Sequence, residues 1–167
     1  MNSTLNLEKD QLLPEFSKAT LKDRYLLPSE QSPQEAFMRA SRAFADDEAH
    51  AQRLYTYASN LWFMFSTPIL ANAGSERGLP ISCNLQYVPD SRAGLFDHYQ
   101  EAGTLSTMGA GLGGYWGHIR SDGVSTSKGS ASSGSIPFMK VMDSIVLGFK
   151  QGKTRRSSYA VYQDISH

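Results

Sequence analysis

The chain has 167 residues, of which 40% are hydrophobic and 19% charged, a composition that excludes a disordered protein. Sixteen basic residues balance sixteen acidic ones, so the charge indicates neither a nucleic acid nor a membrane surface as partner. One cysteine excludes an internal disulfide, and four scattered histidines lack metal-ligand spacing, so no metal site is expected.

The N-terminal part of the sequence is predicted to be helical. Residues 1–31 are polar with scattered apolar positions, which favours an extended arm with a short helix. At 32–35 the sequence Ser-Pro-Gln-Glu forms a capping box with proline in the first turn, which predicts a helix ending near 46–47. A second helix is expected over 47–65. Its core side chains, at helical spacing, are Leu54, Ala58, Leu61, Trp62 and Phe65.

A boundary is expected where this helical part ends. Pro68 closes it, so we divide the chain into an N-terminal helical region, 1–65, and a second region, 66–167. In the second region, apolar segments at 81–88 and 159–165 predict strands.

Two further helices are expected between these strands, one at 92–108 and one that begins at 136 and is stopped by Gly152, each after a capping signal. A glycine run at 109–114 is predicted to form a turn, and the segment 121–135 is rich in glycine and serine. Strand, helix, turn, helix and strand follow in the order of an α/β protein with parallel pairing. Two strands cannot close a sheet, so the predicted α/β fold is incomplete.

Cys83 is the only thiol in the chain and stands at the head of the first predicted strand. One interpretation is a buried, inert cysteine, which is common among free cysteines. The other is a reactive thiol, which needs access to a ligand and neighbouring hydroxyl groups such as those of Ser82 and Thr67. The residues alone leave both interpretations open.

Three other groups are ambiguous by themselves. The glycines at 109–114 permit close approach of a phosphate or sugar, but they lack the spacing of the dinucleotide fingerprint and equally suit a helix C-cap. Asp90 could hold ribose hydroxyls and Arg120 could hold phosphates. The segment 121–135 could instead be a flexible linker. A short basic run could be a solvated loop: Lys153, Arg155 and Arg156.

Taken together, these segments resemble the large catalytic subunit of ribonucleotide reductase, in particular its phage-like class I forms. The ordered elements are Ser-Thr-Pro-Ile-Leu at 66–70, Gly-Leu-Pro-Ile-Ser-Cys at 78–83, Asp-Ser at 90–91, Gly-Leu-Gly-Gly-Tyr-Trp-Gly-His-Ile-Arg at 111–120, Gly-Ser-Ile-Pro-Phe-Met-Lys at 134–140 and Gln-Gly-Lys-Thr-Arg-Arg-Ser-Ser-Tyr-Ala-Val-Tyr at 151–162. The resemblance implies a helical N-terminal region followed by the first strands of a ten-stranded α/β barrel, which this chain leaves incomplete.

The resemblance also implies roles for individual residues. Cys83 matches the redox-active thiol of the active site, whose partner cysteine is not in this chain. The implied substrate contacts are Thr67, Ser82, Cys83 and Gly111. The implied effector site is made by Asp90, Ser91, Arg120, Ser127 and Lys128, although the family often has an arginine where Ser127 and Lys128 stand. The implied second specificity loop contains Gln151, Gly152, Lys153, Arg155 and Arg156.

The implied activity is that of a ribonucleoside-diphosphate reductase, which converts ribonucleotides to deoxyribonucleotides by thiyl-radical chemistry. Thioredoxin or glutaredoxin supplies the electrons. The Asn-x-Cys-x-Glu element that carries the radical cysteine is absent from this sequence. The chain is therefore expected to work with a C-terminal fragment, for instance as the product of a split gene. An N-terminal nucleotide-binding cone is also absent, so overall on/off control is not expected.

Further partners follow from the same resemblance. They are a second large subunit in a homodimer and a small subunit that carries a dimetal radical centre. Class II enzymes use adenosylcobalamin instead, and the radical source stays open. We expect no cofactor on this chain beyond a dNTP or ATP effector, and a cytoplasmic location, in the host if a phage encodes it. Two other interpretations remain: a stand-alone dNTP-binding regulatory module and an inert truncated remnant.

Overall fold

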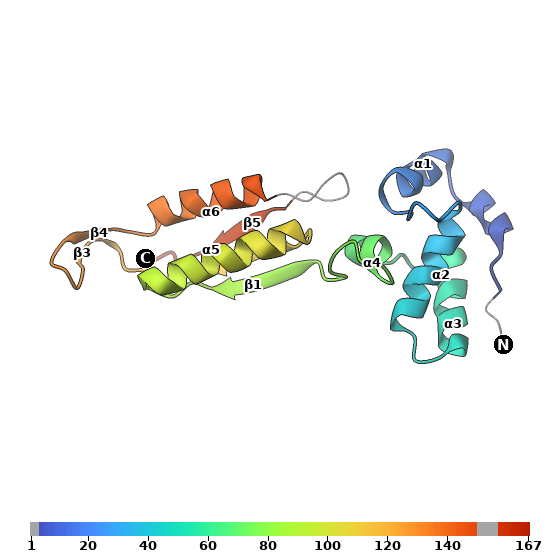
Figure 1. Cartoon of the computed structure of the whole chain (residues 1–167), viewed down its shortest axis with the longest axis horizontal. Coiled ribbons are helices and arrows are strands. Elements are labelled where there is room, and N and C mark those ends of the chain that lie inside the picture. The colour runs from blue at the N-terminus through green and yellow to red at the C-terminus, as the bar shows by residue number, and fades with distance from the viewer. Residues whose placement is uncertain (1–3, 150–156) are drawn as a thin grey trace. The chain divides into compact units, whose positions relative to one another are not determined.

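The chain folds as two compact units, Met1–Ser82 and Cys83–His167, in a computed structural model that describes residues 4–149 and 157–167 (Figure 1). The first unit is helical. It contains a 3-10 helix η1 (Leu7–Leu12) and the helices α1 (Glu15–Arg24), α2 (Pro33–Phe44), α3 (Glu48–Ser59) and α4 (Thr67–Asn72). Among the described residues, no helix is long and apolar enough to cross a membrane.

Helix α2 begins as the sequence predicts. The Ser32 hydroxyl accepts the backbone N–H of Gln34 at 3.1 Å, and the Glu35 carboxylate accepts the backbone N–H of Ser32 at 3.1 Å. Pro33 occupies the first turn, where its missing N–H leaves no helical hydrogen bond unmade. The capping box therefore fixes where this helix starts.

Helix α3 is shorter than the predicted helix at 47–65, because it ends at Ser59. Leu61 adopts a left-handed backbone with φ of 60°, which an α-helix cannot continue through. Leu61 and Trp62 were expected in the core, but they are 43% and 70% exposed. Trp62 instead stacks on Tyr57, with ring centroids 5.5 Å apart. Phe65 packs against the core while partly buried.

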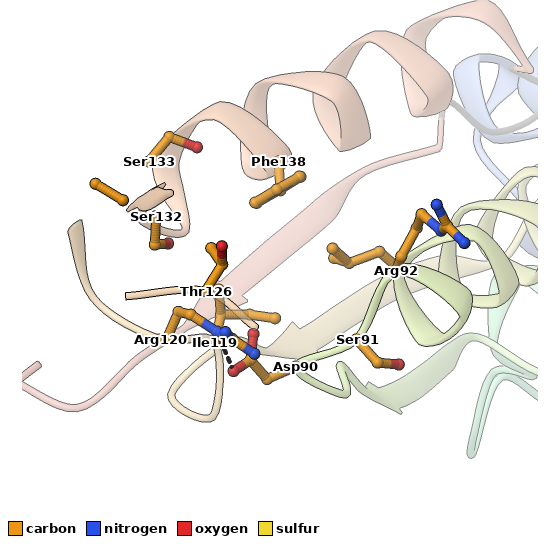
Figure 2. A pocket seen from close by; sticks show the side chains of 11 residues that line it. Asp90, Ser91, Arg92, Ile119, Arg120, Thr126, Ser132, Ser133 and Phe138 are labelled. Carbon is orange, nitrogen blue, oxygen red and sulfur yellow. Dashed lines mark hydrogen bonds and ion pairs between the residues drawn. The ribbon is translucent and has the colours of Figure 1, made fainter. Parts of the chain in front are cut away.

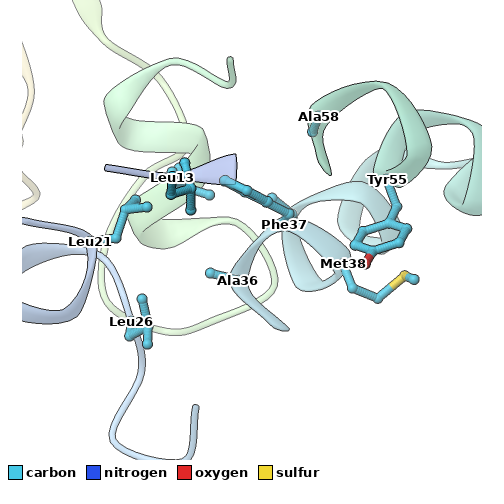
Figure 3. Close-up of a cluster of buried hydrophobic side chains, with 10 residues drawn as sticks. Leu13, Leu21, Leu26, Ala36, Phe37, Met38, Tyr55 and Ala58 are labelled. Carbon is cyan, nitrogen blue, oxygen red and sulfur yellow. The ribbon is translucent and has the colours of Figure 1, made fainter. Parts of the chain in front are cut away.

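The core of the first unit is built around α2 (Figure 3). Tyr55 of α3, which the sequence analysis did not place there, is 1% exposed, and its hydroxyl donates to the side chain of Gln34 at 3.1 Å. The same hydroxyl accepts the backbone N–H of Asn6 at 2.9 Å, which ties the N-terminal segment to α3. The buried cluster consists of Leu13, Leu21, Leu26, Ala36, Phe37, Met38, Ala40, Tyr55, Ala58 and Leu70.

The first unit extends beyond the predicted boundary at residues 65 and 66. Pro68 lies in the first turn of α4 and does not end the helical part. Leu70 of α4 joins the core around α2, so the segment after residue 66 packs with the preceding helices. The compact unit therefore ends at Ser82, directly before the first strand.

The second unit is an open α/β structure. Its strands are β1 (Cys83–Tyr87), β2 (Gly111–Tyr115) and β5 (Tyr159–Tyr162), and its helices are α5 (Arg92–Thr107) and α6 (Ile136–Gly148). The three strands pair in parallel in the order β1-β2-β5. This confirms the predicted α/β class, the parallel pairing and the incomplete sheet.

The central strand β2 is the part of the fold that the sequence analysis missed. We predicted a turn for the glycine run, but Gly113 and Gly114 lie inside the sheet. A Cβ atom at Gly113 would lie 2.8 Å from the ring of Tyr162, and one at Gly114 would collide with the Tyr159 hydroxyl. Glycine is therefore needed here because the side chains of the neighbouring strands cross β2 closely.

The segment 121–135 contains strands that the sequence analysis did not predict. It forms an antiparallel hairpin of β3 (Asp122–Ser125) and β4 (Ala131–Ser133). Gly123 and Gly129 have φ of 80° and 77°, so glycine supplies the left-handed backbone that the hairpin needs. The glycine and serine content therefore marks tight turns and not a linker.

The core of the second unit lies between the sheet and the two helices. Three apolar side chains of the helical segments are exposed, namely Phe96 (64%), Val141 (45%) and Phe149 (53%). His98 of α5 is buried. The buried apolar cluster consists of Val88, Ala102, Ala110, Leu112, Trp116, Ile119, Met142 and Val146.

His98 belongs to a hydrogen-bonded triad inside this unit. The indole Nε1–H of Trp116 donates to the Tyr159 hydroxyl at 3.0 Å, and that hydroxyl lies 2.9 Å from Nε2 of His98. Because an indole only donates, the Tyr159 hydroxyl accepts from Trp116, and the imidazole tautomer sets the direction of its hydrogen bond with His98. Burial lowers the pKa of His98, although the Glu101 carboxylate acts in the opposite direction.

This lowered pKa predicts acid-sensitive folding of the second unit. The unfolded chain protonates His98 near its ordinary pKa of 6.5, while the folded chain does so at lower pH. Stability should therefore fall as the pH drops below about 6.5. We expect the melting temperature, followed by Trp116 fluorescence in a Trp62→Phe background, to decrease from about pH 7.5 to about pH 5.5.

The matched variants separate His98 from other acid effects. His98→Gln should flatten this decrease, whereas His118→Gln, which changes an exposed histidine of the same unit, should keep it. An equal decrease in the parent and in His98→Gln would contradict the assignment.

Candidate functional site

Cys83 is the first residue of β1, and its side chain is exposed. Alternate residues of a strand share one face of a sheet, so Cys83 lies on the same face as Leu85 and Tyr87. These two side chains are 79% and 59% exposed, which shows that the helices do not cover this face. The structure thus excludes the interpretation of Cys83 as a buried core residue.

The pairing of β1 with β2 brings two of the predicted substrate contacts together. Cys83 lies directly opposite Gly111 in the parallel register. Ser82 precedes Cys83 in the chain and is half-buried. The thiol and the backbone of a glycine are therefore brought together where β1 and β2 begin.

Thr67 belongs to the other compact unit. It is the first residue of α4 and is half-buried. Its Oγ1 atom lies 3.3 Å from the hydroxyl of Tyr25, close enough for a hydrogen bond. Among the predicted substrate contacts, Thr67 and Ser82 thus fall in the first unit, and Cys83 and Gly111 in the second.

A second group of candidate residues lines a cavity of about 360 Å³ in the second unit (Figure 2). Asp90 follows β1, and Arg120 follows the short turn after β2, so both lie beyond the carboxyl ends of neighbouring parallel strands. Ligands of open α/β sheets bind at this edge. The cavity is lined by Asp90, Ser91, Arg92, Leu95, Ile119, Arg120, Thr126, Ala131, Ser132, Ser133 and Phe138.

An ion pair joins the two charged residues that were predicted for this site. Nε of Arg120 donates to Oδ2 of Asp90 at 2.8 Å (Figure 2). The side chains of Asp90 and Arg120 are 32% and 34% exposed. Solvent therefore screens the pair, which adds little to folding stability. Because the guanidinium has five N–H donors, the remaining ones are available to an anionic group.

The other predicted effector residues lie differently. Ser91 lines the cavity, but its hydroxyl accepts the backbone N–H of Gly94 at 3.0 Å and caps α5. Ser127 and Lys128 lie at the exposed tip of the hairpin and are not among the residues that line the cavity. The predicted second loop lies outside the described residues: Gln151, Gly152, Lys153, Arg155 and Arg156.

Several lining residues were missed by the sequence analysis. The hairpin contributes Thr126, Ser132 and Ser133, and α6 contributes Phe138. The serine-rich composition of 121–135 was the available signal, since hydroxyl groups near an arginine suit a polar ligand. In the described part of the chain, no group of three or more histidine, cysteine, aspartate or glutamate residues could hold a metal ion.

Comparisons with known proteins give the same family for both units. The model of the ribonucleotide reductase all-alpha domain matches residues 11–78, and that of the ribonucleotide reductase barrel domain matches residues 81–167. A ribonucleoside-diphosphate reductase large subunit of Invertebrate iridescent virus 3 is 41% identical over 165 residues, which cover 98% of this chain and 25% of the viral protein.

Two further relatives extend this finding. The ribonucleoside-diphosphate reductase subunit alpha of Helicobacter pylori is 33% identical, and the match covers 100% of this chain and 22% of that protein. The solved structure of the Actinobacillus ureae class Id ribonucleotide reductase alpha subunit superposes with a TM-score of 0.76 at 33% identity, covering 93% of this chain and 28% of that chain. The chain thus spans about a quarter of the length of these relatives.

The exposure of Cys83 predicts a freely reactive thiol. An aromatic disulfide reagent such as dithionitrobenzoate should modify the folded chain at a rate close to that of the urea-unfolded chain, because Cys83 is exposed. Cys83→Ser is the blank for the assay, since it removes the one cysteine. Modification that requires unfolding would place the thiol in the core instead.

Proposed function

The chain belongs to the ribonucleotide reductase large-subunit family, and from that premise we propose that it supplies the helical region and first barrel strands of a ribonucleoside-diphosphate reductase. The observation that carries this proposal is the exposed Cys83 opposite Gly111 at the start of two parallel strands. In this proposal, the uncovered face of the sheet is where the rest of the barrel and the substrate meet it.

Cys83 acts in this proposal as one of two thiols that reduce the substrate. Oxidation of two thiols to a disulfide releases two electrons and two protons, which replace the 2′-hydroxyl of the ribonucleotide by hydrogen as water leaves. The chain has one cysteine, so the second thiol and the thiyl radical come from a complementary segment of the large subunit. Thioredoxin or glutaredoxin then reduces the disulfide by thiol exchange.

Substrate binding is assigned to polar groups near this thiol. The backbone of Gly111 contacts the nucleotide in this proposal, and the hydroxyls of Thr67 and Ser82, in the other unit, stay predictions as substrate contacts. The register that pairs Cys83 with Gly111 supports it, because one bound molecule can reach both strands at that point. These groups hold the substrate in place, and the radical chemistry comes from outside this chain.

The cavity around Asp90 and Arg120 is proposed as the effector site for a dNTP or ATP. Its volume of about 360 Å³ falls within the range of small-molecule sites. Arg120 meets the phosphates as a charge-assisted donor, and Asp90 accepts hydrogen bonds from the sugar. Phe138 and Leu95 supply apolar surface for the base. Ser127, Lys128 and the second loop stay predictions for the same effector.

The proposed partners are those of a class I enzyme. They are a C-terminal fragment of the large subunit, a second large subunit, and a small subunit that bears the dimetal radical centre, all in the cytoplasm. A stand-alone dNTP-binding module is the second candidate, because the cavity is formed entirely by residues of this chain. The two candidates differ in whether the chain needs a complement for turnover.

The first prediction is that the chain reduces nucleotides only when complemented. The isolated chain should show no reduction of CDP or ADP with a small subunit and reductant, since it lacks the second thiol. Adding a segment that continues the barrel and bears Asn-x-Cys-x-Glu should give turnover. Turnover by the isolated chain, or none with its complement, would contradict the proposed role.

The second prediction concerns Cys83. In the complemented enzyme, Cys83→Ser should abolish multiple turnover with thioredoxin or dithiothreitol, because a hydroxyl cannot close the disulfide. Nucleotide binding should persist, since serine keeps a small polar side chain. Ser144→Ala, an exposed change on α6 that keeps the thiol, is the control and should retain turnover. Multiple turnover in Cys83→Ser would show that this thiol has no part in the reaction.

The third prediction concerns the effector cavity. Removing a hydrogen bond to a charged group typically costs about 1.5–3 kcal/mol, or roughly ten- to hundredfold in affinity. Arg120→Ala should therefore weaken dTTP binding by that factor in calorimetry and blunt effector-dependent substrate choice and dimerisation. Lys140→Ala, an exposed change on α6, is the control. Parental affinity and dimerisation in Arg120→Ala would rule out this cavity as the effector site.

A further inference from the structure

The hydroxyl of Tyr25 meets the hydroxyl of Thr67, with Oη and Oγ1 3.3 Å apart. We infer that Tyr25 is a positioning residue, which orients the Thr67 hydroxyl toward the substrate; this inference rests on the proposed substrate role of Thr67. A threonine hydroxyl has one proton to donate and two lone pairs. When Tyr25 occupies one of these positions, the direction of the others is fixed, and the hydroxyl is ready for a ligand.

Tyr25 is itself held by its backbone. Its N–H donates to the carbonyl of Leu21 at 2.9 Å and ends helix α1. Its carbonyl accepts hydrogen bonds from the guanidinium groups of Arg39, at 3.4 Å, and Arg77, at 3.2 Å. Two cationic side chains on one carbonyl restrict the backbone from which the phenol ring projects.

Arg39 fixes the helix that carries Thr67 as well. Its guanidinium donates to the carbonyls of Leu70 at 3.0 Å and Ala73 at 2.6 Å, at the end of α4. It also forms an ion pair with Glu30 at 2.7 Å, and the two side chains are only 11% and 9% exposed. One buried cation therefore ties the segment after α1 to α4, so the Tyr25–Thr67 distance is determined by rigid contacts.

The hydroxyl pair is open to its surroundings. Tyr25 and Thr67 both line a cavity of about 240 Å³ in the first unit, and both side chains are half-buried. A distance of 3.3 Å is long for two hydroxyl groups. Contacts of this kind often tighten when the substrate binds.

The test uses the complemented enzyme with CDP as substrate. Tyr25→Phe removes one oxygen atom and should raise KM by about three- to tenfold while kcat stays within about twofold. Thr67→Val should have a similar effect. The double variant should be no worse than Thr67→Val alone, because both changes remove the same interaction. Tyr57→Phe, an exposed tyrosine on α3, is the matched control and should leave KM unchanged.

The melting temperature of each variant separates positioning from folding. Tyr25→Phe should melt like the parent, since Arg39 and Arg77 bind its backbone carbonyl and not its hydroxyl. Unchanged KM in Tyr25→Phe, or additive losses in the double variant, would overturn the inference while the proposed function stands. A lower melting temperature with a lower kcat and unchanged KM would do the same. A parent enzyme without turnover would overturn both.

Discussion

The close parallel pairing of the glycine strand β2 with its two neighbours determines where the candidate residues of the second unit lie. Gly113 and Gly114 leave room for side chains of β1 and β5, which a Cβ atom would displace. The start of the β1–β2 pair then carries Cys83, and its carboxyl end leads to Asp90. A thiol and a charged cavity are thus positioned by the same pair of strands.

The first unit depends on a different kind of contact. Arg39 is buried with Glu30 and donates to carbonyl groups of two chain segments, so it joins parts of the chain that have no strand pairing. Removing one member of such a pair leaves a buried charge without its partner, which is costly. Hydrogen bonds from the Arg39 guanidinium therefore hold α4 in place, as the pairing with β2 holds Cys83 in place.

Sequence reasoning succeeded where the signal was local. The cap at Ser32 and the helix after Ser91 were predicted correctly, because each depends on a few adjacent residues. It failed at β2, since glycine carries no strand signal and the constraint comes from the side chains of other strands. The early end of α3 was missed for a related reason. Leu61 adopts a left-handed backbone, and no neighbouring residue in the sequence indicates this.

The family resemblance named Asp90, Arg120 and Cys83 as candidate residues, but only the structure shows the ion pair and the exposed thiol. The most direct measurement is peptide mapping after a single turnover of the complemented enzyme without external reductant. The account predicts a disulfide between Cys83 and a cysteine of the complementary segment, in step with the deoxynucleotide formed. Product formation with Cys83 still a free thiol would contradict it.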